Sequence, residues 1–315
     1  MIAAVALLVV AVACAFMIGV SVNQGGTCAV TAAKELVLER RFRLFRGFAI
    51  TTGAAGLVCL PLTWIASGAV HVAARPEIAP GLLFGAVLLG VGAVINDACL
   101  FGTLSRIGRG ELRFLALPVG LWLGFAISLH APGPISQINP LAEVSAVGVV
   151  VVIAFGLLLV LAWRLSARTD PGTGRWELRH AMATLGVCGA LLFVISPGWS
   201  YAEILRHSLA PRSATMMSDW GGAVAAIAAL AGAVVAGVRS KSFHYRKIEI
   251  WDVFRSLAGG AIMAVGAGMG PGGNDRLLLF SLPSATPGGF AAYVVMSITV
   301  ITLLAAGRHL SRVRH

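Results

Sequence analysis

The stretches Asn23-Gln24-Gly25-Gly26-Thr27-Cys28-Ala29 and Gly92-Ala93-Val94-Ile95-Asn96-Asp97-Ala98-Cys99-Leu100-Phe101-Gly102 decide how the rest of this chain is interpreted. Each follows an apolar run and places glycine and polar residues where a membrane-spanning helix would be expected to continue. Each then leads into a segment that carries several arginines. We interpret them as paired re-entrant elements that meet inside a membrane, where broken backbone must line a cavity or pack against protein.

The composition supports a membrane location. Of the 315 residues 58% are hydrophobic and only 12% are charged, and the mean hydropathy is +0.88. This is too little polar surface to cover a water-soluble globule. Because a spanning helix needs about 20 apolar residues, the sequence predicts an all-α integral membrane protein with about nine transmembrane helices. The predicted spans are 1–22, 44–70, 81–95, one between 113 and 129, 141–163, 181–196, 220–238, 256–269 and 287–306. The first lacks the charged start of a signal peptide and is expected to be retained.

The formal charge of +11 is distributed in short basic clusters between apolar runs. This is the pattern of topology signals and not of a nucleic-acid-binding face. With the N-terminus outside, nine spans place segments 34–46, 106–113, 164–179, 239–255 and 308–314 in the cytoplasm, and these hold 20 of the 24 Lys and Arg residues. The sequence therefore predicts an external N-terminus and a cytoplasmic C-terminus.

The interrupted stretches also indicate an internal repeat. Adding 172 to the numbers of Cys28 and Cys99 gives Ser200 and Pro271, the centres of two further interruptions, 197–201 and 270–275. Each half then has four spans and two interruptions, and the single span between them makes the halves cross in opposite senses. We expect pseudo-repeat 1 at about 1–130, a linking helix at about 141–163 and pseudo-repeat 2 at about 180–307, forming an hourglass with a central waist. The alternative is a chance offset in a glycine-rich chain.

The residues at the waist suggest anion chemistry. A half-helix N-terminus offers free backbone amides and a favourable dipole to an anion. Thr27 and Asp97 are expected to be N-caps, which would place Cys28 and Cys99 in the first turns of their half-helices. A neutral thiol would offer a weak donor to the anion, whereas a thiolate would repel it. Alternatively, both cysteines are small packing residues, the role that we assign to Cys14, Cys59 and Cys188.

Other polar and aromatic residues leave alternatives open. Asp97 and Asp275 either cap helices or gate the path, because ionisable groups at membrane depth tend to be functional. Trp199, Tyr201 and Trp220 fit an interfacial aromatic belt better than a substrate cage. The five cysteines have no C-x-x-C spacing, and the histidines have no metal-like spacing. We therefore expect no metal site. No nucleotide-binding loop is present, so we also expect no ATP hydrolysis, and we expect no cofactor.

Most of the chain resembles the YeeE/YedE sulfur-transport family, whose best-understood members are bacterial inner-membrane thiosulfate permeases. The residues that carry the resemblance are 23–46, 92–115, Gly268-Met269-Gly270-Pro271-Gly272-Gly273-Asn274-Asp275 and Ser281-Leu282-Pro283. The resemblance implies an hourglass-shaped permease in the bacterial inner membrane. It also implies thiosulfate passing cysteines at the waist and a small cytoplasmic sulfur-carrier protein as partner.

The resemblance matches Cys28 and Cys99 to two pathway cysteines. The third cysteine that the family pattern expects has no counterpart, because Met269, Gly270 and Gly272 occupy that region. The candidate substrate-binding residues are Cys28, Cys99, Gly25, Gly26, Thr27, Asn96, Asp97, Gly272, Gly273, Asn274 and Asp275.

The sequence thus predicts a permease, not an enzyme, for thiosulfate or a related sulfur-containing anion. The alternative is a membrane-embedded thiol redox or sulfur-relay subunit, in which Cys28 and Cys99 form a redox pair or carry a persulfide.

Overall fold

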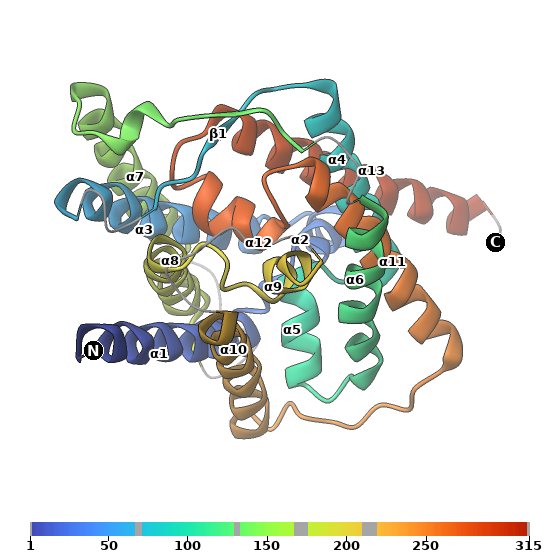
Figure 1. The fold of residues 1–315 in the computed structure, drawn as a ribbon. Coiled ribbons are helices and arrows are strands. Elements are labelled where there is room, and N and C mark those ends of the chain that lie inside the picture. Colours follow the sequence, from blue (N-terminus) through green and yellow to red (C-terminus); the bar gives the residue numbers. More distant parts are fainter. Residues whose placement is uncertain (1, 67–70, 129–132, 167–175, 210–218, 314–315) are drawn as a thin grey trace.

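The computed structural model describes residues 2–66, 71–128, 133–166, 176–209 and 219–313, and is almost entirely helical (Figure 1). Within these residues, eight helical segments are long and apolar enough to cross a membrane. They contain α1 (Ile2–Gly25), α3 (Arg43–Ile65), α4 (Pro80–Asn96), α7 (Ala146–Ser166), α8 (Leu178–Ile195), α10 (Asp219–Arg239), α11 (Ile250–Met269) and α13 (Pro287–Val313). The prediction of an all-α, multi-pass membrane protein is confirmed.

The ninth predicted span is shorter than expected. It consists of a 3-10 turn, η2 (Leu112–Ala116), followed by α6 (Leu117–Ser128). At 1.5 Å per residue, the 12 residues of α6 cover about 18 Å, well below the roughly 30 Å of a bilayer core. α6 lies along α11 and ends at Ser128, the last described residue before the connection.

Two predicted boundaries differ from the structure for local reasons. The helix predicted to start at 256 begins at Ile250, and its first turns accommodate charge because Asp252 pairs with both Arg255 and Arg113. The span predicted at 141–163 is displaced to Ala146–Ser166. Its first residues instead form the 3-10 turn η3 (Pro140–Ala142), which the Asn139 side chain caps at Leu141 N.

Short helices occur at each of the interrupted stretches. α2 (Ala29–Lys34) follows the first and α5 (Leu100–Gly108) the second. α9 (Tyr201–His207) and α12 (Asn274–Arg276) follow the third and fourth. Two of them continue into π-helical segments, α2 into η1 (Glu35–Glu39) and α12 into η4 (Leu277–Ser281). All four short helices lie near the middle of the view in Figure 1.

The long helices pack in pairs through small residues. α1 packs on α8 and α10, α3 on α7 and α8, α4 on α11 and α13, and α11 on α6. Between α4 and α11 the backbones touch, because a Cβ at Gly92 would lie 2.6 Å from the Gly259 carbonyl oxygen. A Cβ at Gly266 would lie 2.4 Å from the Gly85 carbonyl oxygen. Glycine at these positions is what allows the two helices to approach so closely.

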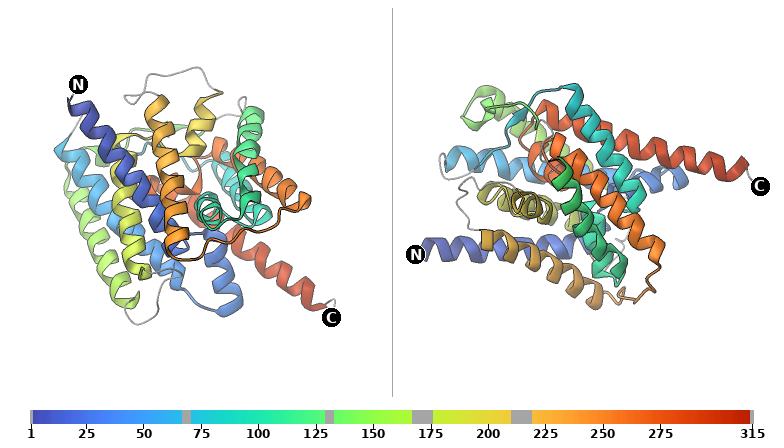
Figure 2. Two further views of the ribbon diagram at one scale, coloured as in Figure 1. Left: turned by 90° about the horizontal axis from the view of Figure 1, so that it is seen from below. Right: turned by 45° about the vertical axis from the view of Figure 1, so that its right-hand side comes forward.

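The outer surface is apolar along the helices. Most of α7 faces outward, and its Val150, Ile153 and Leu157 side chains are more than 60% exposed. Such a surface suits lipid and not water. Figure 2 (left) shows the N-terminus and α9 toward one end of the molecule and the C-terminus toward the other.

A small β-ladder joins two connecting segments that the sequence predicted as loops. β1 (Arg75–Pro76) pairs antiparallel with β2 (Ser136–Gln137), and these are the only strands in the described part of the chain. Nearby, the buried Asn139 amide donates to the carbonyl oxygens of Ala73 and Ser284. These contacts tie the connection before α4 to the connection before α7.

Candidate functional site: a junction of interrupted helices

The two cysteines of the interrupted stretches are themselves the N-caps of the short helices. Cys28 caps α2 and Cys99 caps α5, both with extended backbone. The prediction that Thr27 and Asp97 are N-caps is wrong. Asp97 has a left-handed φ of 63° and is the C-cap of α4, while Thr27 belongs to the turn that leaves α1. Cys28 therefore lies one position, and Cys99 two positions, nearer the N-terminal end of its short helix than predicted.

The sulfur of Cys99 joins the two half-helices. It accepts a hydrogen bond from Gly102 N, in its own helix, at 3.5 Å and one from Ala29 N, the first residue of α2, at 3.3 Å. The Cys28 thiol lies within hydrogen-bonding reach of the Cys99 thiol. A Cβ at Gly102 would lie 2.4 Å from Cys28 Sγ, so glycine leaves the space that this sulfur fills. Cys28 is 4% and Cys99 1% exposed, so the junction is closed in this conformation.

The interrupted stretches of the second half reach the same junction. Leu100, the first residue of α5, donates its amide to the side-chain oxygen of Asn274 at 3.2 Å. Its carbonyl accepts a hydrogen bond from the Tyr201 hydroxyl at 3.0 Å. A Cβ at Gly273 would lie 2.3 Å from Leu100 Cδ1, which shows how closely the fourth stretch approaches. All four interrupted stretches thus meet around Cys28, Cys99 and Leu100.

Aromatic residues of the third stretch lie inside the protein. Trp199 is 4% exposed and packs edge-on against Phe193, with ring centroids 5.3 Å apart. Tyr201 is half-buried and holds Leu100. The prediction of an interfacial belt is wrong for both, because their neighbours are helices and not lipid. The side chain of Trp220 lies outside the described residues.

The predicted residues beside Cys28 face a neighbouring helix. Gly25 ends α1, and Gly26 has a positive φ of 63° in the turn that follows. The Thr27 hydroxyl lies 3.6 Å from the sulfur of Met182 in α8. These three residues shape the turn that presents Cys28, and the Thr27 side chain contacts α8.

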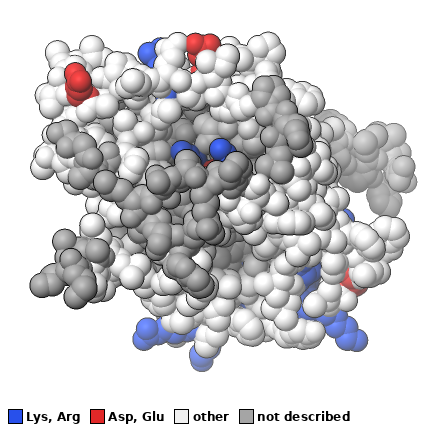
Figure 3. All heavy atoms as spheres, viewed as in Figure 1, with Lys and Arg blue, Asp and Glu red and all other residues white. Residues whose placement is uncertain are grey.

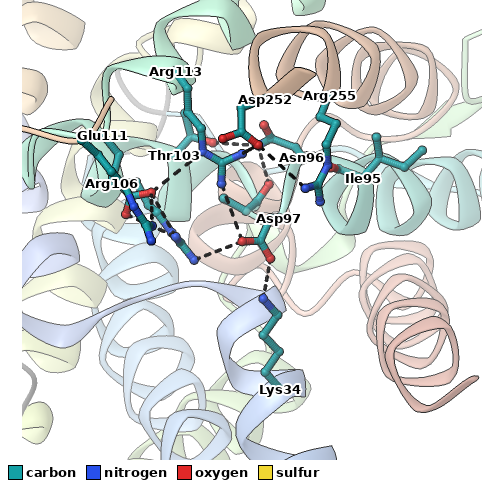
Figure 4. A network of polar contacts seen from close by, with 12 residues as sticks. Lys34, Ile95, Asn96, Asp97, Thr103, Arg106, Glu111, Arg113, Asp252 and Arg255 are labelled. Atoms are coloured by element: carbon teal, nitrogen blue, oxygen red, sulfur yellow. Dashed lines mark hydrogen bonds and ion pairs between the residues drawn. The ribbon is translucent and has the colours of Figure 1, made fainter. Parts of the chain in front are cut away.

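Asn96 and Asp97 have structural partners of different kinds. The Asn96 amide donates to Ala98 O at 2.8 Å and to Thr103 Oγ1 at 3.1 Å, which braces the turn before Cys99. Its side-chain oxygen is buried and has no hydrogen-bond partner among the residues that the structure describes. The Asp97 carboxylate points into a cluster of ion pairs (Figure 4).

This ion cluster surrounds Asp97 with three cations. The Lys34 ammonium, at the end of α2, forms a short contact with Asp97 Oδ1. Arg106 and Arg113 approach Oδ2 at 3.5 Å and 3.7 Å. Glu111, Asp252, Arg246 and Arg255 extend the network through further ion pairs of 3.2–3.9 Å. The cluster ties α2 to the turn between α4 and α5, so both half-helices are fixed at this end as well.

Gly272, Gly273 and Asp275 lie together at the start of α12. Gly272 has a φ of 126°, which favours glycine, and a Cβ there would lie 3.1 Å from the carboxylate of Glu203 in α9. Asp275 is 3% exposed, and one of its carboxylate oxygens has no hydrogen-bond partner in the described ranges. The structure therefore brings Cys28, Cys99 and the 272–275 loop together and places Gly25, Gly26, Thr27 and Asp97 around them.

Sequence reasoning missed two site residues, Lys34 and Glu203. Lys34 belonged to a basic segment and looked like a topology signal, and Glu203 stood in a short polar helix. A usable signal for Glu203 was its spacing from Arg206 and His207, which puts all three on one helical face.

Fold and junction define the class: a multi-pass membrane protein whose broken helices direct their first turns at a shared pair of thiols. Comparison with known families then gives the family, because the sulphur transport model matches residues 24–302 of the 315. The chain belongs to this YeeE/YedE sulphur transport family, and its function is sulfur transport. No match among curated proteins is found.

Proposed function

We propose that this protein is a permease for thiosulfate or a related sulfur-containing anion in the inner membrane of bacteria. The observation that carries the proposal is that backbone amides of both half-helices, Ala29 N and Gly102 N, donate to the single sulfur of Cys99. Amides in the first turn of a helix bind anions well. An anion that enters the junction can take these amides in place of the neutral sulfur.

The two thiols give the junction a preference for sulfur compounds. As neutral groups, Cys28 and Cys99 donate weakly and do not repel a negative ion. Their sulfur atoms are polarizable and suit contact with the terminal sulfur of thiosulfate. Both thiols are buried in the closed conformation, so transport requires the tips of α2 and α5 to separate.

The second half supports an inverted repeat with the boundaries given above. In the repeat, α1, α2, α3, α4 and α6 of the first half correspond, in this order, to α8, α9, α10, α11 and α13 of the second half. When each helix is replaced by its counterpart, pairs of helices that pack together become other pairs that also pack together. The pair α1 with α10 becomes α8 with α3, α4 with α13 becomes α11 with α6, and α2 with α13 becomes α9 with α6. This pattern favours a repeat over a chance offset. We therefore propose two oppositely oriented halves related by a pseudo-twofold axis in the membrane plane.

The charge distribution supports entry of the anion from outside and exit to the cytoplasm. Lys34, Arg106 and Arg113 lie in segments that the basic-residue asymmetry places in the cytoplasm. An anion that leaves the junction on that side meets these cations around Asp97. A small cytoplasmic sulfur-carrier protein is the acceptor that we propose for the imported sulfur.

Uptake of labelled thiosulfate tests the permease proposal. Cells that lack other sulfate and thiosulfate importers should take it up when they make this protein, with sulfite, sulfate and selenite as competitors to define selectivity. Cys28→Ala and Cys99→Ala should each lower uptake about 10-fold, since a hydrogen bond to a charged group contributes about 1.5–3 kcal/mol. The matched control is Cys59→Ala, another fully buried thiol, which contacts Ser284 in place of the junction. Full uptake by Cys99→Ala would remove the role of the thiol.

A second candidate function rests on the proximity of the Cys28 and Cys99 thiols. In a sulfur relay, a thiolate attacks the outer sulfur of thiosulfate, an S–S bond forms on the cysteine, and sulfite leaves with the electron pair of the broken bond. This reaction balances without an added oxidant. Mass spectrometry of native membranes would show one extra sulfur on Cys28 or Cys99 if the relay operates, and unmodified thiols if the protein is a permease only.

A further inference from the structure

Two acidic side chains lie buried beside the junction. Asp275 and Glu203 are each 3% exposed and are neighbours, on α12 and α9. Within the described part of the chain, one oxygen of each carboxylate, Asp275 Oδ1 and Glu203 Oε2, is buried without a hydrogen-bond partner. Glu203 Oε2 still has His207 Nε2 at 4.0 Å, so Asp275 Oδ1 is the oxygen left without any polar partner among the described residues. Buried polar atoms are normally paired, so this unpaired oxygen indicates a missing ligand.

The two carboxylates differ in the charges around them. Glu203 pairs with Arg276 at 3.5 Å, Arg206 at 3.6 Å and His207 at 4.0 Å, so its negative charge is compensated. Asp275 has no cationic side chain within 4 Å among the described residues. Ser200 and the backbone amides of Asp275 and Arg276 are the groups next to it. Its neighbour Glu203 adds repulsion.

This difference decides which carboxylate holds a proton. Burying an ionised carboxylate without a counter-ion is expensive, and such a group is neutralised instead. Two carboxylates that share a site do not both stay ionised readily. Because the arginines stabilise the charge on Glu203, the proton belongs on Asp275.

Asp275 is coupled directly to the junction. A Cβ at Gly273 would lie 2.6 Å from Asp275 Oδ1 and 2.3 Å from Leu100 Cδ1, so only a glycine separates the carboxyl from the first residue of α5. On either side, Asn274 and Tyr201 bind the amide and the carbonyl of Leu100. A change of charge at Asp275 therefore acts next to the thiols.

The cluster lies on the side from which a proton would enter. α9 is on the N-terminal side of the molecule (Figure 2, left), which the basic-residue asymmetry places outside. Figure 3 shows basic atoms in a hollow near the middle of this face, with acidic atoms beneath them. α9 and α12 are near the middle of the same view in Figure 1.

We propose that Asp275 binds a proton from the external side and that this proton enters the cell together with the sulfur anion. The inference rests on the permease function and adds its energy source. In the neutral form, Asp275 donates a hydrogen bond through its O–H to an anion at the tips of α2 and α5. After the proton leaves toward the cytoplasm, the carboxylate repels the anion and promotes its release.

Purified full-length protein in liposomes tests the proposal, with a pH-sensitive dye inside and labelled thiosulfate outside. Wild-type protein should acidify the interior as thiosulfate enters. For each anion, Asp275 should carry about one proton. An inward proton gradient should drive accumulation. In Asp275→Asn the number of protons per anion should fall to near zero at whatever anion rate remains, and in the exposed control Glu143→Gln it should be unchanged.

Two outcomes would overturn the proposal: anion entry without proton entry in the wild type, or an unchanged ratio in Asp275→Asn. If Asp275→Asn does not transport thiosulfate, the pH dependence of uptake by Glu203→Gln provides the test. Removing the neighbouring negative charge weakens proton binding at Asp275, so half-maximal uptake should shift to lower pH. An unshifted profile contradicts the proposal. Exchange of labelled for unlabelled thiosulfate across the membrane without any gradient tests the permease function separately.

Discussion

At the scale of single residues, the space around Cys28 matters as much as its chemistry. Gly102 lies against the sulfur of Cys28, and no larger residue fits without moving it. Cys99 depends on the same residue, because Gly102 N donates to its sulfur. One glycine thus positions both thiols, although it has no side chain that can touch a substrate.

Gly102→Ala tests this positioning role. The added Cβ would lie 2.4 Å from Cys28 Sγ, so the thiol must shift and thiosulfate uptake should fall about 10-fold or more. Gly156→Ala in α7 is the matched control, since its Cβ would meet only Leu57 at 3.7 Å. The amount of protein in the membrane should be equal for both variants. Equal uptake by the two would show that the thiol position does not matter.

Asp97 is a second residue with a defined task. Asp97→Asn leaves the charges of Lys34, Arg106 and Arg113 without their shared carboxylate. Because these groups are partly exposed, we expect a loss of on the order of 1–2 kcal/mol. Thermal unfolding in detergent should show a Tm lower by about 2–4 °C per kcal/mol. Glu39→Gln, whose pairing with Arg41 is exposed, should leave Tm unchanged. If Tm fell equally in this control, the ion cluster around Asp97 would not stabilise the protein more than an exposed ion pair does.

At the scale of elements, the contact between α4 and α11 holds the second interrupted stretch in place. Gly259→Val would bring a Cβ to within 2.7 Å of both the Gly92 carbonyl oxygen and Asn96 Cβ. Overpacking of this kind typically costs about 1–3 kcal/mol, so the yield of monodisperse protein in mild detergent should fall. Gly307→Val in α13, where nothing lies within 4 Å, is the control. An unchanged elution profile for Gly259→Val would show that the two helices can separate without harm.

The elements also show where sequence reasoning reached its limit. Long apolar runs predict spans, and the glycine-rich breaks at Gly25–Gly26 and Gly272–Gly273 predict interruptions, because both signals are local. The cap at Asp97 was predicted wrongly because aspartate favours N-caps in general, whereas here cations from α2 and η2 hold it at a C-cap. The bonds from Ala29 to Cys99 and from Leu100 to Asn274 join residues 70 and 174 positions apart, which no local pattern encodes.

At the scale of the whole molecule, the basic segments predict one orientation. A C-terminal green fluorescent protein fusion should fluoresce, and a C-terminal alkaline phosphatase fusion should be inactive, because both report a cytoplasmic end. Fusions truncated within the connection at 133–140 should behave in the opposite way. Active phosphatase at the C-terminus would reverse the proposed direction of entry and place Asp275 on the cytoplasmic side.

The π-helical segments η1 and η4 have a consequence for the whole molecule. One follows α2 in the first half and the other follows α12 in the second. A π-helical turn contains more residues than an α-helical turn. If η1 converted to α-helix while the chain after it stayed in place, α2 and Cys28 would move by one helical position. In an α-helix, one position is about 100° of rotation and 1.5 Å of rise. Such a step would turn Cys28 away from Cys99 while the long lipid-facing helices stay where they are.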